Sequence, residues 1–409
     1  MIKPPFLIRD AQESDMPTIN YLFASQDFPD APGPEGIRVA IGDGNVMFGA
    51  IRIEHAPDGS DNINPVVVFG VKQGLGVGKA LVVDALKKHP DLRLVARGHS
   101  VGFYEALGFV RCGWEGIDPK YRTDCDMCPM LGTCGPVPFK SVPARHVLTF
   151  LGTSSGCGVP AFFCHCPACE EARRDPSKRR GCTGVVIQGN GTTLIDAPPD
   201  VRQALIREGF DTIDELFLTH AHYDHLGGLG ELEYFIRLCR EGTLPFRGSS
   251  HALAEALQEF SYMDDCFELD AIDDYATRSF DGMTIQALPL NHCPGAFGYL
   301  ITTPNGHRTF YAPDTAELKP EVIEVLKGVD TLIMDATFWK NVGVHKTHHT
   351  VHQTVDEGIN LLGAGKVILQ HLAPHMCDEG VNEIHEIYQY AAQFGGRVAV
   401  AEDGMKVEL

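Results

Sequence analysis

Three histidines and one aspartate lie within six residues of one another, as His220-Ala221-His222-Tyr223-Asp224-His225. His220 and His222 are two residues apart, so an extended backbone points both imidazoles to the same side. Asp224 and His225 follow on the turn into the next element, where they can face a second point. Imidazole and carboxylate ligands suit borderline divalent cations such as zinc and manganese. The pattern predicts a metal site rather than a polar loop that is incidentally rich in histidine.

Further ligand-type residues end apolar runs that are predicted to be buried strands. These residues are Asp196, His220, His292, Asp314 and His371. Two packed sheets can bring such strand ends to one edge, where loops carry the chemistry. We therefore expect these side chains to converge, with Asp196 bracing a metal-bound histidine.

Two sets of cysteines have the spacing of metal ligands. Cys164, Cys166 and Cys169 form a tight Cys-x-Cys-x-x-Cys loop, which predicts a structural zinc held by three thiolates and one nitrogen. Cys125, Cys128 and Cys134 lie among prolines and glycines, with Cys112 as a candidate fourth ligand. They predict either an additional zinc or iron–sulfur site, or reduced thiols in a connector. Reduced thiols are also the alternative for the first set.

The composition is that of a soluble, acidic protein with more than one domain. The chain has 409 residues, and 34 Lys+Arg against 54 Asp+Glu give a net charge of −20. This charge argues against a broad nucleic-acid surface. No apolar run is long enough for a membrane span, and the first residues lack the core of a signal peptide. With 13 cysteines at metal-binding spacings, we expect a reducing, cytoplasmic location.

Residues 1–118 are predicted to form a small mixed α/β domain. A glycine-rich turn, Gln73-Gly74-Leu75-Gly76-Val77-Gly78, separates a predicted strand from a predicted helix, and backbone amides at such a turn can bind a pyrophosphate. Together with Phe103-Tyr104-Glu105-Ala106-Leu107-Gly108-Phe109, this turn resembles the GCN5-related N-acetyltransferase family. The resemblance implies acetyl-coenzyme A bound at Gln73, Gly74, Gly76 and Gly78, with Tyr104 as general acid and Glu54 as a candidate base. The alternative is a degenerate domain kept for stability or docking.

Residues 119–145 are predicted to be a Cys-rich linker, and residues 146–409 a second domain. The order of His220, His222, Asp224, His225, His292, Asp314 and His371 is similar to that of the metallo-β-lactamase superfamily. This resemblance implies an αββα sandwich with two metal ions at the sheet edge. His220, His222 and His292 would hold one ion; Asp224, His225 and His371 would hold the other, with Asp314 bridging.

Several segments, among them Leu288-Pro289-Leu290-Asn291-His292 and the Cys164–Cys169 loop, resemble the phosphoribosyl cyclic phosphate phosphodiesterases of phosphonate breakdown. The resemblance implies that a cyclic ribose phosphate is opened to ribose 1,5-bisphosphate. It makes His375 the fourth ligand of the structural zinc and His349 the catalytic histidine. His348 and His352 lie close enough to His349 in sequence that either could be the catalytic histidine instead.

Two metal ions would make hydroxide available near neutral pH, with Asp224 orienting it and His349 protonating the leaving oxygen. We expect a small phosphorylated sugar as substrate, zinc or manganese as the ions, and a homodimer. The first domain would suit the acetylation of aminoalkylphosphonates. Three alternatives stay open: an RNA-processing phosphodiesterase, a protein of pyrroloquinoline quinone biosynthesis, and a non-catalytic metal- or coenzyme-A-binding sensor.

Overall fold

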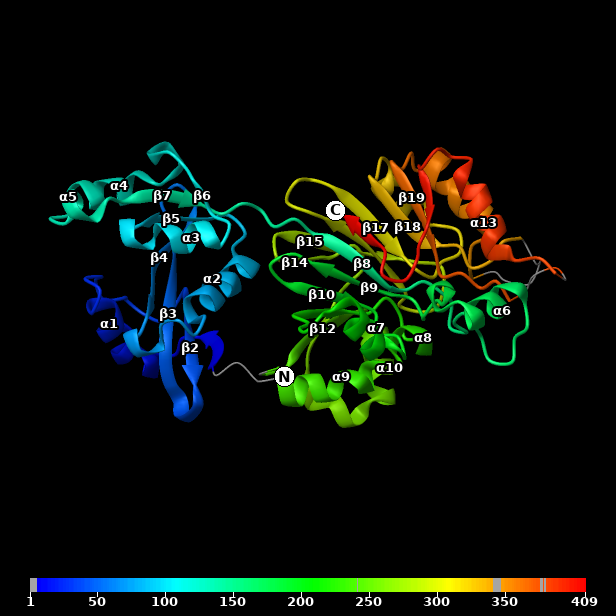
Figure 1. Ribbon diagram of the computed structural model, residues 1–409, viewed down its shortest axis with the longest axis horizontal. Coiled ribbons are helices and arrows are strands. Elements are labelled where there is room, and N and C mark those ends of the chain that lie inside the picture. Colours follow the sequence, from blue (N-terminus) through cyan, green and yellow to red (C-terminus); the bar gives the residue numbers. More distant parts are fainter. Residues whose placement is uncertain (1–5, 241, 341–346, 376–377, 379) are drawn as a thin grey trace. The chain divides into compact units, whose positions relative to one another are not determined.

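The computed structural model describes residues 6–240, 242–340, 347–375, 378 and 380–409, and separates into two compact units, Met1–Ala144 and Arg145–Leu409 (Figure 1). Each unit has its own apolar core. Within the described residues, we find no helix with the length and hydrophobicity required to cross a bilayer.

The first unit is built on one seven-stranded sheet in the order β1-β2-β3-β4-β5-β7-β6. Its strands are β1 (Phe6–Asp10), β2 (Ile37–Gly42), β3 (Val46–His55), β4 (Asp61–Val68), β5 (Leu92–Ala96), β6 (Val110–Arg111) and β7 (Val137–Lys140). Its helices are α1 (Met16–Ala24), α2 (Val77–Lys88), α3 (Val101–Ala106), α4 (Pro119–Asp126) and α5 (Leu131–Cys134). Apolar residues of α1 and α2 enter two separate clusters, because the strands between them alternate their side chains between the two faces.

The segment 119–145, which we expected to be a linker, contributes α4, α5 and β7 to this first unit. Strand β7 pairs with both β5 and β6, so it lies inside the sheet. Its Phe139 is fully buried opposite Leu94. The prolines and glycines of the segment concealed this short strand, since one buried aromatic residue in four is a weak periodic signal.

The second unit contains two seven-stranded sheets, ordered β13-β12-β11-β10-β9-β8-β21 and β14-β15-β16-β17-β18-β19-β20. The strands of the first are β8 (Val147–Gly152), β9 (Gly184–Gln188), β10 (Thr192–Ile195), β11 (Glu215–Phe217), β12 (Leu244–Gly248), β13 (Phe267–Ala271) and β21 (Lys406–Glu408). Those of the second are β14 (Thr277–Phe280), β15 (Met283–Pro289), β16 (Phe297–Thr302), β17 (Arg308–Ala312), β18 (Thr331–Asp335), β19 (Lys366–Gln370) and β20 (Val398–Val400).

Helices cover the outer faces of these two sheets. One sheet is covered by α7 (Val201–Glu208), α8 (Tyr223–Leu226), α9 (Leu229–Tyr234) and α10 (Ser250–Glu259), and the other by α11 (Pro320–Leu326), α12 (Val351–Asp356) and α13 (Glu383–Ala392). Helix α6 (Pro167–Arg174) packs in a separate small cluster with Val159. Figure 1 shows α7, α9 and α10 on one side of the strands and α13 on the other. The expected αββα layering is therefore present.

Neighbouring residues of the central strands belong to different layers of the core. Phe217 packs between the sheets, whereas Leu216 and Leu218 pack under α7, α9 and α10. Likewise Ile333 faces the other sheet, and Leu332 and Met334 face α11 and α12. Strands covered on both faces are apolar without interruption, which is why they stand out in the sequence.

Candidate metal ligands follow the ends of parallel strands, and these ends lie at one edge of the two sheets. β10 runs parallel to β11, and β17, β18 and β19 run parallel to one another. Tyr299 of β16 donates a hydrogen bond of 2.6 Å to the carbonyl oxygen of Leu218, which follows β11. This buried bond joins the two sheets two residues before His220.

Candidate metal centre

Three imidazoles form the first group of ligands. His220 and His222 follow β11, and His292 follows β15. His222 Nδ1 lies 3.0 Å from His220 Nε2 and 3.0 Å from His292 Nε2. Ligands of one tetrahedral ion with metal–nitrogen bonds of about 2.0–2.1 Å are roughly 3.3 Å apart. The three nitrogens are therefore spaced to hold one cation.

A second group consists of Asp224, His225, Asp314 and His371, whose ligand atoms all lie within 4.8 Å of one another. Asp314 Oδ1 is 3.2 Å from His225 Nε2 and 3.1 Å from His371 Nε2. Its other oxygen, Oδ2, is 3.7 Å from His220 Nε2 and 3.5 Å from His292 Nε2. Asp314 thus presents one oxygen to each group.

The residues present fit a pair of divalent cations. His225 Nε2 and Asp314 Oδ1 are buried and have no hydrogen-bond partner, which is rare in native proteins unless an ion or water satisfies the atoms. Nitrogen and carboxylate oxygen are the ligand types that zinc and manganese share. Both orphaned atoms lie where a cation of the second group would be held.

Two buried aspartates orient four of the histidines around this centre. His225 Nδ1 donates to Asp196 Oδ2 at 2.9 Å, and His220 Nδ1 contacts Thr219 Oγ1, which in turn donates to Asp196. In the other sheet, Asp335 accepts from His348 Nδ1 at 2.7 Å. His371 reaches Asp335 through Thr337. These bonds turn Nε2 of His220, His225 and His371 toward the centre, as outer-sphere partners of metal ligands do.

The ligand at the end of β19 also has a strained backbone. His371 has a φ of +59°, and Asp196, at the end of β10, has a φ of +65°. A residue with a side chain adopts this left-handed conformation at a cost of about 1–3 kcal/mol, so the surrounding structure must enforce it. The strain occurs where a strand must turn its last side chain toward the shared edge.

The charges of the centre favour a cation. Burial opposes protonation of His225, but the carboxylates of Asp314, Asp224 and Asp196 outweigh it and raise the pKa of His225 well above its usual value. Burial likewise opposes ionisation of Asp314, yet His371 and His225 hold the pKa of Asp314 well below its usual range. The carboxylate of Asp314 therefore stays ionised, and a divalent cation can replace the proton on His225.

The structure separates the adjacent residues His348 and His349, and it does not support His349 as the catalytic histidine. Both ring nitrogens of buried His349 are engaged inside the protein, with the carbonyl oxygen of Thr315 at 2.8 Å and with Glu357 Oε1 at 2.9 Å. His348 instead stacks on His371, with ring centroids 5.3 Å apart. It is His348 that lies beside the ligands His292 and Asp314.

The sequence contained a signal for this assignment. Thr350 caps α12 and forms a capping box with Gln353. The residue before an N-cap commonly packs back against its helix, which places His349 inside and leaves His348 free to face the centre. His352 contacts the carbonyl oxygen of Trp339 at 3.2 Å, and His345 lies outside the described residues.

Part of the second unit matches a known protein family. Residues 191–372 match the family model of the beta-lactamase superfamily domain. These residues form a metallo-β-lactamase superfamily domain. The family match confirms the metallo-β-lactamase fold that was predicted for the second unit.

Three relatives show the extent of the likeness. The crystal structure of a diphosphatase of the PhnP family superposes with a TM-score of 0.56 at 26% identity, covering 65% of this chain and 97% of that one. The Coenzyme PQQ synthesis protein B of Acinetobacter baumannii is 25% identical over 302 residues, covering 63% of this chain and 98% of the relative. An octanoyltransferase of Porphyromonas gingivalis is 27% identical over 235 residues, covering 55% of this chain and 45% of the relative. The match thus spans less than half of the octanoyltransferase.

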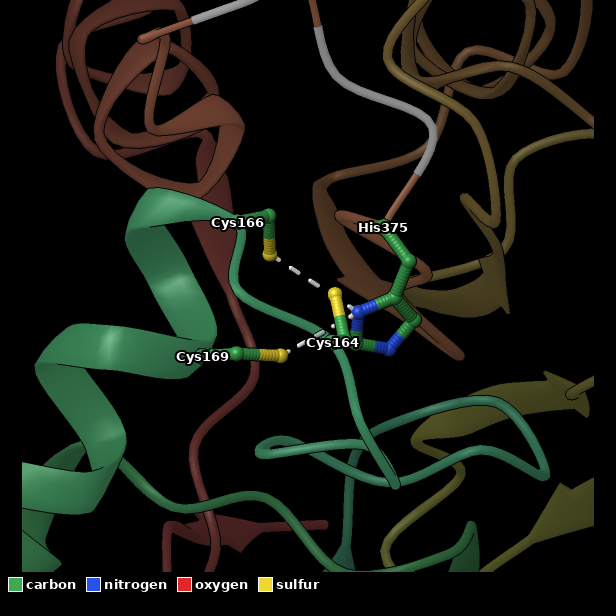
Figure 2. A group of neighbouring side chains, drawn as sticks. All are labelled: Cys164, Cys166, Cys169 and His375. Atoms are coloured by element: carbon green, nitrogen blue, oxygen red, sulfur yellow. Dashed lines mark hydrogen bonds between the residues drawn. The ribbon is translucent and has the colours of Figure 1, made fainter.

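The second unit carries a further cluster, formed by the three cysteines of the tight loop and His375. Figure 2 shows the four side chains pointing toward one another, with their ligand atoms within 4.8 Å. His375 Nε2 donates to the carbonyl oxygen of Gly158 at 2.9 Å, which leaves Nδ1 facing Cys169 Sγ at 3.3 Å. Burial raises the pKa of the Cys169 thiol to about 12, so a thiolate there needs a cation. Three sulfurs and one nitrogen fit a structural zinc.

The other cysteine set does not converge. In the portion of the chain that the structure describes, Cys125, Cys128 and Cys134 belong to no group of three ligand atoms within 4.8 Å, and neither does Cys112. The geometry therefore gives no support to an additional metal at these residues.

The predicted coenzyme residues of the first unit line a pocket of about 530 Å³. β4 and β5 pair only at Asp61–Leu92 and Asn62–Arg93, and the pocket lies between their unpaired ends. Its lining includes Gln73, Gly74, Gly76, Gly78 and Tyr104. Gly76 is the N-cap of α2 with a φ of +78°, which glycine adopts without strain. The turn therefore leaves the first amides of α2 free.

The structure suits Tyr104 to act as a general acid in the first unit better than it suits Glu54 to act as a base. Tyr104 is buried, which raises its pKa far above the usual value and keeps the hydroxyl protonated. Burial would also raise the pKa of Glu54, but hydrogen bonds from Asn64 and Tyr121 outweigh it and lower that pKa below its ordinary value. Glu54 is not among the residues lining the pocket, so the structure does not support it as a base.

Replacing Cys166 by alanine should remove about one zinc per chain and lower the melting temperature by at least about 5 °C, since each 1 kcal/mol corresponds to roughly 2–4 °C in a domain of this size. Turnover per folded molecule should change less, because the cluster lies outside the ligand groups of the two-ion centre. Metal analysis and thermal unfolding measure the first two effects. Cys157→Ala, which removes an exposed cysteine, is the matched control. Full zinc content and an unchanged melting temperature in the Cys166 variant would contradict the assignment.

Proposed function

We propose that the metallo-β-lactamase domain is a two-ion phosphodiesterase that opens a small cyclic ribose phosphate, 5-phosphoribosyl 1,2-cyclic phosphate, to ribose 1,5-bisphosphate. The observation that carries the proposal is Asp314, whose oxygens approach the histidines of both ligand groups at 3.1–3.7 Å. A carboxylate so placed is suited to bridge two cations. Such a pair is common in enzymes that cleave phosphate esters.

Bound divalent ions lower the pKa of a water ligand and withdraw charge from phosphoryl oxygens. The chain's own residues supply orientation and the proton. Asp224 Oδ2, 3.4 Å from His371 Nε2, can accept a hydrogen bond from the attacking water. This hydrogen bond orients the water so that a lone pair on its oxygen points toward the phosphorus.

His348 is the proton donor that the geometry favours. Burial works to lower its pKa, but the hydrogen bond and charge of Asp335 outweigh this and raise the pKa of His348 above its ordinary value. Asp335 holds Nδ1 at 2.7 Å, so Nε2 is the nitrogen left to protonate the leaving ribose oxygen. A histidine that is protonated near neutral pH is suited to this role.

The comparison with a diphosphatase of the PhnP family supports phosphate-ester chemistry, since nearly all of that chain is covered. The net charge of −20 weighs against RNA processing, because an RNA substrate needs an extended basic surface. The likeness to PQQ synthesis proteins keeps a role in cofactor synthesis as the second candidate. The complete set of ligands in both groups favours hydrolysis over that role and over a sensor.

The substrate assignment is tested with the purified full chain, loaded with zinc or with manganese. Phosphorus NMR should show the cyclic phosphate signal replaced by that of a monoester, and a chelator should abolish the conversion. Precursor tRNA and bis(p-nitrophenyl) phosphate serve as comparison substrates. Cleavage of the tRNA but not of the cyclic sugar would favour RNA processing. The absence of metal-dependent turnover on all three would exclude a phosphodiesterase.

His348→Ala should reduce turnover by roughly 100- to 10,000-fold, the usual contribution of a general acid, with the metal content unchanged. The adjacent His349→Ala is the matched control. It should destabilise the fold by about 1–3 kcal/mol, because it leaves buried partners without hydrogen bonds, but leave turnover per folded molecule within a fewfold. If the first variant loses an ion, His348 is a metal ligand instead. If only the second loses activity, the roles are reversed.

For the first unit we propose binding of acetyl-coenzyme A, and with it an acetyl transfer whose acceptor is an amine. The pocket between β4 and β5 combines free amides at the start of α2 with the cationic side chains of Lys72, Lys79 and Arg97. Amides and cations together suit a pyrophosphate. Protonated Tyr104 at the same pocket can return a proton to the departing thiolate.

Lys79→Gln should weaken acetyl-coenzyme A binding about fivefold, which corresponds to about 1 kcal/mol, because one cation near the pyrophosphate is lost. Isothermal titration measures the change. Lys88→Gln removes the same charge from the far end of α2, outside the pocket lining, and should bind as the unaltered protein does. No binding to the unaltered protein would favour a degenerate domain.

A further inference from the structure

Cys293 places a sulfur beside the first group of ligands. The sulfur of Cys293 and the ligand nitrogens of His220, His222 and His292 all lie within 4.8 Å of one another. Cys293 is a free cysteine, and no other described residue forms a hydrogen bond with its sulfur. It is therefore available to an ion held by the three imidazoles.

The turn between β15 and β16 explains how two successive residues reach the same point. In an extended strand the side chains of His292 and Cys293 would point to opposite faces. Here the chain reverses, with the amide of Ala296 donating to the carbonyl oxygen of Cys293 at 3.2 Å. Leu290 donates to Ala296 at 2.9 Å and closes the turn. Cys293 also packs against the apolar cluster under α11 and α12, which fixes its position.

The sulfur adds a donor to the first group beside the carboxylate of Asp314, which the two groups share. Asp314 is nearer to the second group, at 3.1 and 3.2 Å, than to the first, at 3.5 and 3.7 Å. Three nitrogens and one sulfur are therefore the donors that the first ion would not share with the second. Thiolate ligands select zinc, whereas manganese prefers oxygen. The first group therefore has a soft sulfur donor that the second group lacks, although both groups lie at the same sheet edge.

We propose that the Cys293 thiolate is a protein ligand of the first ion, which makes this position a zinc site of three imidazoles and one thiolate. Its neighbour, formed by Asp224, His225, Asp314 and His371, keeps only nitrogen and oxygen ligands. On binding, the thiol proton is released to solvent and a sulfur–zinc bond forms. The inference rests on the two-ion centre of the proposed function and specifies the ion at one of its positions.

Cadmium-113 NMR of the full-length protein tests the proposal, because each thiolate ligand moves the resonance of the bound ion downfield. Three resonances are expected, from the cysteine cluster with three sulfurs, the first ion with one, and the second ion with none. In Cys293→Ser the middle resonance should move upfield, and the other two should keep their positions. An unchanged resonance from the cysteine cluster also shows that the variant is folded.

Cys182→Ser is the matched control. Its sulfur lies 3.7 Å from the carbonyl oxygen of Gly156, a residue beside Asp224 of the other group, so all three resonances should stay in place. Three resonances that Cys293→Ser leaves unmoved would overturn the inference alone. If the unaltered protein gives only the resonance of the cysteine cluster, the two-ion function is overturned as well.

A measurement on the unaltered protein covers the case in which Cys293→Ser does not fold. When the protein is loaded with zinc and dialysed against excess manganese, the first position should retain zinc while the second exchanges. Metal analysis should then show two zinc ions per chain, one of them in the cysteine cluster, and one manganese. Equal replacement at both positions would contradict a thiolate ligand.

Discussion

The geometry of the second unit depends on one buried carboxylate. Asp314 is almost fully inaccessible to solvent and lies among four histidines. An ionised carboxylate in such a place is costly unless cations or hydrogen-bond donors surround it. Imidazoles that follow strands of both sheets surround this carboxylate, and a cation bound among them would offset its charge. The two sheets must therefore pack in one register for the charge to be accommodated. Metal binding and the packing of the αββα sandwich are therefore linked through a single side chain.

The supports on either side of this carboxylate are alike in chemistry although they come from different sheets. Asp196 holds one histidine directly and another through Thr219, and Asp335 does the same through Thr337. Both aspartates are fully buried. Each therefore fixes two ring orientations with one charge. The strained backbone of Asp196 and His371 is tolerated because these hydrogen bonds hold both residues in place.

Much of this centre could be predicted from the sequence, because strands buried on both faces are continuously apolar and end abruptly at their polar ligands. His220, Asp314 and His371 each follow such a run. The choice of His348 or His349 as the histidine that faces the centre depended on which of the two immediately precedes the helix cap Thr350. The two residues differ by only one position in the sequence. Cys293 had no sequence signal, since only the turn after β15 brings it beside His292. In the first unit, β7 was missed because a strand of four residues with one proline and a polar last residue carries little periodicity.

The cysteine cluster also joins parts of the chain that are far apart in sequence. Cys169 and His375 are separated by 206 positions, and His375 comes four residues after the metal ligand His371. A zinc ion there would act as a cross-link around a very long loop, and by analogy with disulfides such closure would stabilise the fold by about 5 kcal/mol. On the ribosome, the cysteines emerge long before their histidine partner. The cross-link can close only after His375 has been synthesised, when all strands of the two sheets except β20 and β21 are present.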